Sequence, residues 1–230
     1  MSRRTSSILL SFIAAFALSV NAAKPSSKPS KGETLETVLK KVIDQQKKTM
    51  SLEAEFRQEK TLALLAQPEI STGTFSFAKP NQVLWVYQAP RKLQLLVSKG
   101  WLTTYYPDLN KAERLEVKRF EDRIFKYMGA TGTIEELARY FDFTFTDTKG
   151  QPSYRLELSP KTKIVAKRVR KITIWIDRSS YLTNRFEYVE GDGDITKYDF
   201  TNIRLNQKIE PTRFTLNLPA TVKMQSMKLN

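Results

Sequence analysis

The segment FAKPNQVLWVYQAP, residues 77–90, constrains the fold more than any other stretch of this chain. Successive side chains of an extended strand point to opposite faces. Its apolar side chains therefore fall into two sets, with Val83, Trp85 and Tyr87 on one face and Leu84 and Val86 on the other. A strand that is apolar on both faces needs cover on both sides. Either it lies at the centre of a packed core, or one face lines a cavity that holds an apolar ligand.

Alternation of apolar and polar residues with a period of two recurs along most of the chain and predicts a β-rich domain. It extends over two runs, residues 52–117 and 142–216, in which turn residues such as Lys99-Gly100 separate short segments. The pattern predicts about eleven short strands in sequential antiparallel order, the last of them over residues 213–216. An antiparallel sheet of this length usually curls into a barrel or splits into a sandwich.

Three segments have helical periodicity instead. The first, residues 35–50, has an apolar stripe after Thr34, which is a candidate N-cap. The second and third, residues 120–128 and 134–141, interrupt the strands. Each helix must bury its stripe, and the sheet offers the available apolar surface. We therefore expect an α+β fold in which about three short helices cover the sheet.

The N-terminus has the features of a secretory signal peptide. Arg3 and Arg4 precede a mostly apolar run, residues 8–20, that is too short to span a bilayer comfortably. Val20 and Ala22 provide small residues at a cleavage site. The predicted segments are a signal peptide over 1–22, a flexible leader over 23–33 and a single domain over 34–230. This organisation predicts an exported mature protein.

Cysteine and histidine are both absent. Without cysteine there are no disulfides and no acylated N-terminal cysteine, so stability must come from the core. Without histidine the commonest general base, Ser-His-Asp sites and most zinc sites are excluded, and we expect neither a metal nor a cofactor. The net charge of +14 favours an anionic membrane surface or an acidic partner over nucleic acid in an exported protein, with solubility as the alternative.

Several short motifs occur in a fixed order along the chain. They comprise Gly73, Lys79, Pro80, Trp85, Val97, Ser98, Gly100, Tyr106 and Pro107, and near the C-terminus Phe214 and Pro219. In this order they resemble the LolA family of periplasmic outer-membrane lipoprotein carriers. The resemblance covers residues 34–224, nearly the whole of the predicted mature chain.

The resemblance implies a half-open antiparallel β-barrel lidded by short helices, acting as a monomer in the periplasm. Its cavity would shelter the acyl chains of lipoproteins released by an inner-membrane ABC transporter and pass them to an outer-membrane receptor. Exposing a methylene group to water costs about 0.8 kcal/mol, so three chains cost on the order of 30 kcal/mol. Such chains cannot cross an aqueous compartment uncovered. A lid that closes weakly over an apolar floor would also let the cargo go.

Nine residues are candidates for the acyl-chain cavity, with ordinary core packing as the alternative for each. They are Phe56, Phe75, Phe77, Val83, Trp85, Tyr87, Leu93, Leu95 and Val97. Lys79 stands where the family usually has an arginine that hydrogen-bonds the lid. Lysine offers a point charge rather than a planar fork, so we expect a lid that is held less firmly or by another residue.

A basic run, KTKIVAKRVRK, is a candidate docking patch for anionic headgroups or for an acidic patch on the transporter. Its basic residues are Lys161, Lys163, Lys167, Arg168, Arg170 and Lys171. The alternative is a solvated hairpin edge whose lysines prevent edge pairing. The acidic run over residues 190–194 does not match the calcium-loop spacing and is interpreted as a hairpin turn.

Two other functions compete with lipoprotein transport. The first is a LolA-like carrier or sensor of another lipid, such as a glycolipid. The second, more remote, is an exported hydrolase that uses carboxylates only. Co-purification separates these functions, because a lipoprotein carrier should retain triacylated protein, a lipid sensor should retain free lipid, and an enzyme should retain neither.

Overall fold

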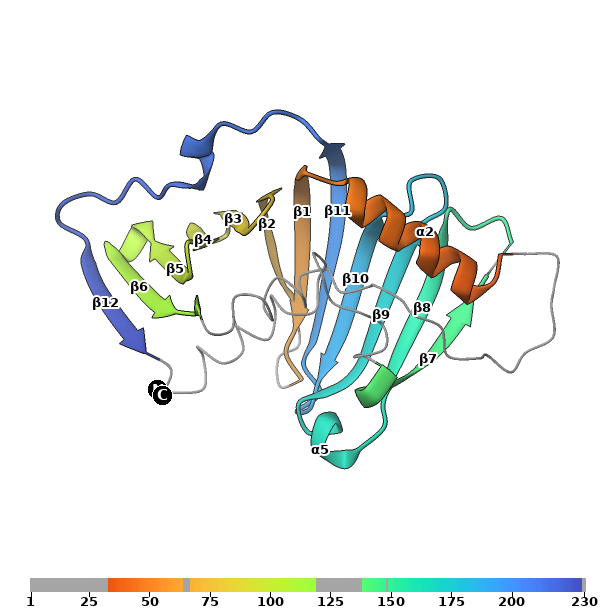
Figure 1. Ribbon diagram of the computed structural model, residues 1–230. Helices are drawn as coiled ribbons and strands as arrows, with labels where there is room; N and C mark the ends of the chain where they lie inside the picture. Colours follow the sequence, from red (N-terminus) through yellow and green to blue (C-terminus); the bar gives the residue numbers. More distant parts are fainter. Residues whose placement is uncertain (1–32, 64–66, 119–137, 148, 229–230) are drawn as a thin grey trace. The chain divides into compact units, whose positions relative to one another are not determined.

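The computed structural model describes residues 33–63, 67–118, 138–147 and 149–228 (Figure 1). The predicted signal peptide, nearly all of the predicted leader and the predicted helix at 120–128 lie outside these residues. Residues 134–137 of the predicted helix at 134–141 lie outside them too, whereas residues 138–140 are helical and Phe141 begins a strand. The chain divides into two compact units, which are described separately below.

The first unit comprises Met1–Lys48, Glu59–Glu69 and Ile124–Asp199. Its elements are α2 (Leu35–Lys48), β7 (Phe141–Thr146), β8 (Ser153–Pro160), α5 (Lys163–Ala166), β9 (Val169–Asp177) and β10 (Thr183–Glu190). The second unit comprises Thr49–Gln58, Ile70–Arg123 and Phe200–Asn230. Its elements are β2 (Glu69–Ala78), β3 (Gln82–Ala89), β4 (Leu93–Ser98), β5 (Trp101–Tyr106), η1 (Pro107–Leu109), β6 (Lys111–Glu116), η3 (Pro211–Phe214) and β12 (Lys223–Lys228). Strands β1 (Ser51–Thr61) and β11 (Ile195–Leu205) have residues in both units, and β2 has only its first residue, Glu69, in the first unit.

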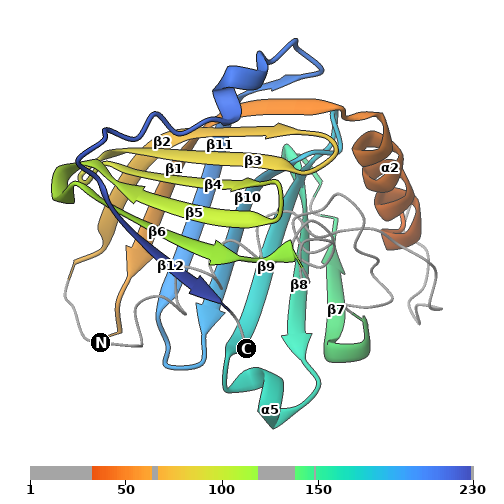
Figure 2. The same ribbon diagram turned by 60° about the vertical axis from the view of Figure 1, so that its left-hand side comes forward.

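The twelve strands found among the described residues form one hydrogen-bonded series in the order β12-β6-β5-β4-β3-β2-β1-β11-β10-β9-β8-β7. Figure 2 shows the neighbouring strands β2 to β6 of the second unit. The predicted fold class, an α+β half-open antiparallel β-barrel of about eleven strands with short helices, is confirmed in that the described residues form a mostly antiparallel sheet that does not close and carry short helices. The series ends at β12 and β7. The ladders from β2 to β6 and from β11 to β7 are antiparallel, and β12 runs parallel to β6.

One sequence-based expectation about local structure was wrong. Residues 211–214, where the last strand was expected to begin, form the 3₁₀ turn η3, and the final strand is β12 instead. Pro211 opens η3, and proline pre-sets the backbone angle of a turn and cannot donate to a sheet ladder. The basic run lies in and just after the connection between the antiparallel strands β8 and β9, and the single turn α5 forms part of that connection.

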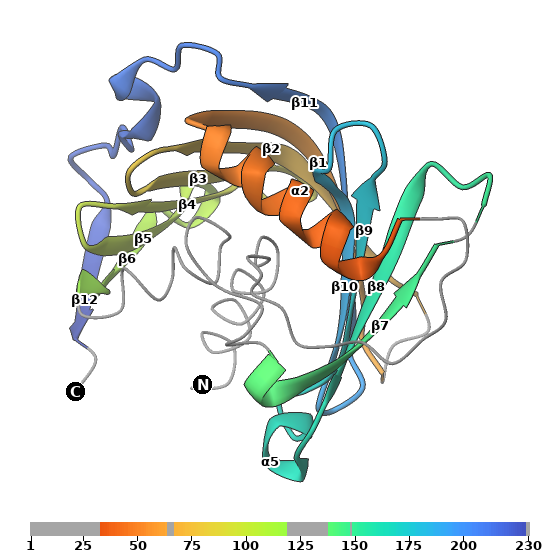
Figure 3. The same cartoon turned by 45° about the vertical axis from the view of Figure 1, so that its right-hand side comes forward.

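Helix α2 begins as expected after Thr34, whose hydroxyl accepts a hydrogen bond from the backbone N–H of Thr37 at 3.2 Å. The helix buries Val38, Leu39 and Val42, which lie on one stripe of its surface. Its N-terminal half is anchored within the first unit, because Lys41 Nζ donates to the Tyr181 hydroxyl at 2.8 Å. Figure 3 shows α2 beside the strands of this unit.

The core of the first unit is aromatic and aliphatic. The Phe186 ring stacks on Tyr198 of β11 and on Tyr188 of β10, with centroid distances of 5.5 Å in both cases. Leu156, Leu158 and Ile176, on the neighbouring strands β8 and β9, are fully buried. Their period-two spacing is the signal from which the strands were predicted.

Candidate functional site

The ladder of the second unit brings the predicted cavity residues of β2, β3 and β4 onto one face. Directly opposed residues of antiparallel strands point to the same side of the sheet. The register places three such rows, Phe77–Val83–Val97, Phe75–Trp85–Leu95 and Gly73–Tyr87–Leu93. Eight of the nine candidates thus share a face that the sequence alone could not identify.

Phe56 of β1, the ninth candidate, packs on the same face. Its ring meets Trp85 at a centroid distance of 4.9 Å and Tyr87 at 4.8 Å, both edge-on, which is a favourable geometry for aromatic pairs. Gly73 makes room for this ring, because a Cβ atom built at Gly73 would lie 2.7 Å from the Phe56 ring and 2.0 Å from the Val86 carbonyl oxygen. The glycine of the sequence motif is therefore required by close packing.

Phe200 of β11 completes the aromatic cluster and was missed by the sequence analysis. Its ring centroid lies 6.0 Å from that of Trp85 and 6.4 Å from that of Phe75, while Phe75 and Trp85 are 4.7 Å apart. The sequence did contain a signal for Phe200, because this residue continues the period-two alternation of the strand predicted over residues 195–203. Only the tertiary fold shows that this strand presents Phe200 to β2 and β3.

Burial separates Leu93 from the rest of this face. Trp85 is 1% exposed and Leu95 is fully buried, whereas Leu93 is half-buried. All nine side chains are apolar or aromatic, so the face favours hydrocarbon over a polar ligand. That these residues line a cavity for acyl chains stays a prediction.

The opposite face of β3 and β4 has a different cover. Leu84 and Leu96 pack against Phe214 of η3, which is 5% exposed. Arg213 holds the same segment in place, since its Nε donates to Ser76 Oγ at 3.3 Å and lies 4.0 Å from Glu53 Oε1. The strand at 82–88 is apolar on both faces because an aromatic cluster covers one and the segment around η3 covers the other.

Lys79, the predicted lid latch, lies at the end of β2 and is half-buried. Its backbone N–H donates to the Met50 carbonyl oxygen at 2.9 Å, and the peptide bond to Pro80 is cis. The helix predicted at residues 120–128, which would contribute to the lid, lies outside the described residues. The latch therefore stays a prediction.

The structure divides the predicted docking patch into two groups. Lys161 donates to the Ala138 carbonyl oxygen at 2.5 Å, Arg170 to the Gly191 carbonyl oxygen at 2.5 Å, and Lys171 lies 2.9 Å from Glu157 Oε1. These three cations have partners within the protein. The others are Lys163, Lys167 and Arg168, which are exposed on and beside α5.

A polar cluster that the sequence analysis did not foresee joins α2 to β8 in the first unit. The Glu33 carboxylate accepts hydrogen bonds from Lys41, from Tyr154 at 2.8 Å and from Tyr181 at 3.2 Å. The bond from Lys41 is the main reason that the pKa of Glu33 lies below its usual value of 4.5, although burial opposes this shift. Burial, followed by the bond to Glu33, raises the pKa of Tyr154 to about 12.

Beside this cluster lies a pocket of about 600 Å³, whose lining includes Glu33, Asp147, Tyr154 and Arg178. Arg178 donates to Asp147 at 2.6 Å and lies 4.1 Å from the centroid of the Tyr154 ring. The lining groups thus satisfy one another. The bond from Tyr154 to Glu33 holds the residues just before α2 on the sheet of the first unit, and Arg178 packs against the ring of this bond's donor.

Within the described ranges, no group of three or more acidic residues is placed to hold a metal ion. No helix among the described residues is long and apolar enough to cross a membrane.

Comparison with known proteins decides the family. Residues 47–217 match the family model described as "Outer membrane lipoprotein carrier protein LolA", which is well over half of the chain. The chain belongs to the LolA family. The recognised region contains all nine residues of the aromatic and aliphatic face and Lys79.

Curated LolA-family relatives are similar over most of their length. The outer-membrane lipoprotein carrier protein of Pseudomonas paraeruginosa is 26% identical over 180 residues, which is 76% of this chain and 81% of that protein. The protein of the same name from Pseudomonas fluorescens is 23% identical over 175 residues, 75% of this chain and 80% of that one. These names support a lipoprotein-carrier role for this LolA-family protein.

A solved structure supports the fold independently of sequence. The crystal structure of an uncharacterized conserved protein from Thermus thermophilus has a TM-score of 0.54 at 7% identity, covering 86% of this chain and 100% of that chain. At this identity the likeness concerns the fold alone.

Proposed function

We propose that this LolA-family protein is a periplasmic chaperone that carries triacylated lipoproteins by sheltering their acyl chains against the face formed by β1 to β4. The observation that carries the proposal is the single apolar face, which gathers Phe56, Trp85 and their neighbours from four strands. Family membership implies a carrier and not an enzyme. The cargo would come from an inner-membrane ABC transporter and go to an outer-membrane receptor, with the carrier acting as a monomer.

The physical basis is the cost of hydrating acyl chains. Each methylene moved out of water contributes about 0.8 kcal/mol, so partial cover of three chains already gives tight binding. The aromatic rings of this face can supply that contact when they separate from one another. In the closed arrangement the same rings bury each other, as the centroid distance of 4.7 Å between Phe75 and Trp85 illustrates. Cargo would thus compete with packing inside the protein, which weakens the net grip and permits release.

Two adjacent residues of β4 offer a matched test. Leu93 lies on the proposed acyl face, opposite Tyr87, and Gln94 lies on the other face, opposite Val86. Both side chains are half-buried, so each can be replaced by glutamate with little difference in folding cost. A carboxylate that faces hydrocarbon loses its hydration, whereas one on the other face does not.

The assay uses spheroplasts incubated with the purified mature chain and measures newly made lipoproteins that leave the inner membrane. We expect Leu93→Glu to release at least tenfold less lipoprotein than the unmodified chain, and Gln94→Glu to release nearly as much. Circular dichroism should show both variants to be folded. Equal release by the two variants would contradict the assignment of this face.

The identity of the bound molecule tests the class of cargo. The protein isolated from the periplasm should bring triacylated protein with it. Free lipid in place of lipoprotein would favour the related carrier or sensor of another lipid. Absence of both from a preparation that is active in the spheroplast assay would contradict stable sheltering of the chains.

A further inference from the structure

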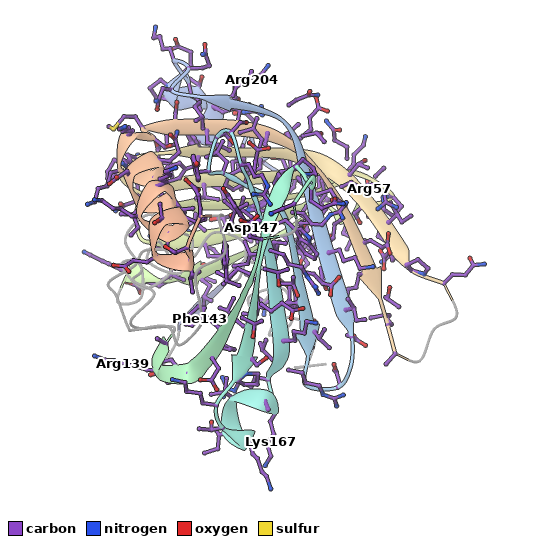
Figure 4. All side chains as sticks on the ribbon, turned by 90° about the vertical axis from the view of Figure 1, so that its right-hand side faces the viewer. Arg57, Arg139, Phe143, Asp147, Lys167 and Arg204 are labelled. Carbon is purple, nitrogen blue, oxygen red and sulfur yellow. The ribbon has the colours of Figure 1, made fainter. Side chains whose placement is uncertain are left out.

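The connection between β8 and β9 presents an exposed isoleucine among cations. The α5 tip, defined as residues Lys161–Arg168, contains the single helical turn α5. Ile164 of this turn is 79% exposed, more than any other large apolar side chain recorded among the described residues. Figure 4 shows the turn projecting from the ends of β8 and β9, with Lys167 pointing away from the sheet.

The backbone fixes this exposure. Thr162 caps α5, since its hydroxyl accepts a hydrogen bond from the backbone N–H of Val165 at 3.3 Å. At the other end the Arg168 carbonyl oxygen accepts a bond from the Gly191 N–H at 2.9 Å. Gly191 packs so closely that a Cβ atom there would lie 1.8 Å from the Lys167 carbonyl oxygen. The tip is therefore held against the β10–β11 turn, and Ile164 stays outside.

All charged residues that flank Ile164 in the basic run, residues 161–171, are positively charged. Residues 161–171 include six basic residues and no acidic ones. Among the described residues, Lys163, Lys167 and Arg168 have no ion pair with a carboxylate, in contrast to Lys171. Asp192, in the adjacent β10–β11 turn, is an exposed carboxylate that weakens the positive field without pairing with the three cations.

An aromatic residue lies beside the tip. Tyr140 is 50% exposed, and its carbonyl oxygen accepts a hydrogen bond from the Lys161 N–H at 2.8 Å. Tyrosine is enriched at the interface between a membrane and water, because its ring is apolar and its hydroxyl is polar. An exposed isoleucine, a tyrosine and three cations at one end of the first unit form a combination typical of surfaces that lie on an anionic bilayer.

We propose that the α5 tip docks this protein onto the surface of an anionic phospholipid bilayer. Ile164 enters the boundary between headgroups and acyl chains, and Lys163, Lys167 and Arg168 contact lipid phosphates. An acidic protein is the less favoured partner, because a stable protein interface needs about 800 Å² on each side and a single helical turn offers far less. Docking goes beyond cargo carriage and does not depend on which lipid is carried.

The expected effect follows from the charges. Each lysine or arginine near an anionic surface contributes about a fivefold increase in membrane partitioning, so three give about a hundredfold. Screening by salt should weaken the interaction, because the charges are exposed.

The first experiment uses sedimentation with vesicles of phosphatidylglycerol or of phosphatidylcholine. The test variant replaces Lys163, Lys167 and Arg168 by glutamine. The control makes the same change in charge at three exposed cations elsewhere, Lys40, Arg91 and Lys92. We expect the test variant to bind phosphatidylglycerol vesicles about a hundredfold less tightly, with the control unchanged and little binding to phosphatidylcholine. Equal losses in both variants would overturn docking by the tip in favour of non-specific attraction.

The second experiment uses the absence of cysteine. Ile164→Cys and the control Leu109→Cys, whose native side chain is 70% exposed, each accept one environment-sensitive fluorophore. Phosphatidylglycerol vesicles should shift the emission of the label at 164 to the blue and leave the label at 109 unchanged. No shift at 164 would refute insertion.

The vesicle and spheroplast assays together separate a membrane from a protein partner. Suppose that the native chain binds no vesicles but the triple variant still loses lipoprotein release. That result would indicate an acidic protein partner and would overturn the proposal. A failure of vesicle binding with normal lipoprotein release would overturn docking and leave the carrier function intact.

Discussion

Replacement of Gly73 by alanine tests the packing between β2, β3 and Phe56. The new Cβ would lie 2.0 Å from the Val86 carbonyl oxygen and 2.7 Å from the Phe56 ring. The ring can turn aside, but the carbonyl oxygen belongs to the backbone of β3 and moves only with that strand. Alanine at this position therefore forces β2 and β3 apart.

The cost can be worked out from these contacts. Overpacking of a well-packed core costs about 1–3 kcal/mol. Displacing Phe56 from Trp85 and Tyr87 removes two aromatic contacts, each worth about 0.5–1.5 kcal/mol. We expect the free energy of unfolding to fall by about 3–5 kcal/mol. In a chain of this size each 1 kcal/mol lowers Tm by about 2–4 °C, so Tm should fall by about 10 °C.

The assay is thermal and urea unfolding followed by circular dichroism and tryptophan fluorescence. Gly150→Ala is the control, because Gly150 has a φ of +81° but no atom within 4 Å of a new Cβ, so only backbone strain of about 1 kcal/mol is expected. A second variant combines Gly73→Ala with Phe56→Leu. Since the clash with the carbonyl oxygen persists, stability should not recover. A loss below about 1 kcal/mol for Gly73→Ala, or full recovery in the double variant, would refute the reasoning.

Two further predictions concern the cluster at Glu33 and the predicted lid latch. The pKa of Glu33 is lowered in the folded state, so its contribution to stability is present above pH 4.5 and is lost as the pH falls through the folded-state pKa. Glu33→Gln should therefore lower stability by about 1 kcal/mol near pH 7 and by almost nothing in strong acid, as urea unfolding at several pH values will show. Lys79→Arg should slow lipoprotein release in the spheroplast assay, because a planar guanidinium holds a closed lid more firmly than an ammonium group. Unchanged release kinetics would count against the latch.

Local pattern was sufficient to predict much of this fold. The alternation at residues 82–88 predicted β3, and the stripe after Thr34 predicted α2 with its cap. These features depend on neighbours in the sequence, since side chains two or four positions apart share a face. The motif from Gly73 to Pro107 also sufficed for the family, whose model matches residues 47–217.

Long-range contacts decided the rest. No local signal shows that Phe200 joins Trp85, that Phe214 covers Leu84, or that the hydroxyl of Tyr154 meets Glu33. Such contacts join residues more than a hundred positions apart and depend on which strands pair. From the sequence, the basic run was predicted to be one docking patch of six cations. In the fold, Lys171 pairs with Glu157, and Lys163, Lys167 and Arg168 of the α5 tip are exposed. Composition and periodicity thus determined the strands and their apolar content, and strand pairing alone determined which faces those side chains share.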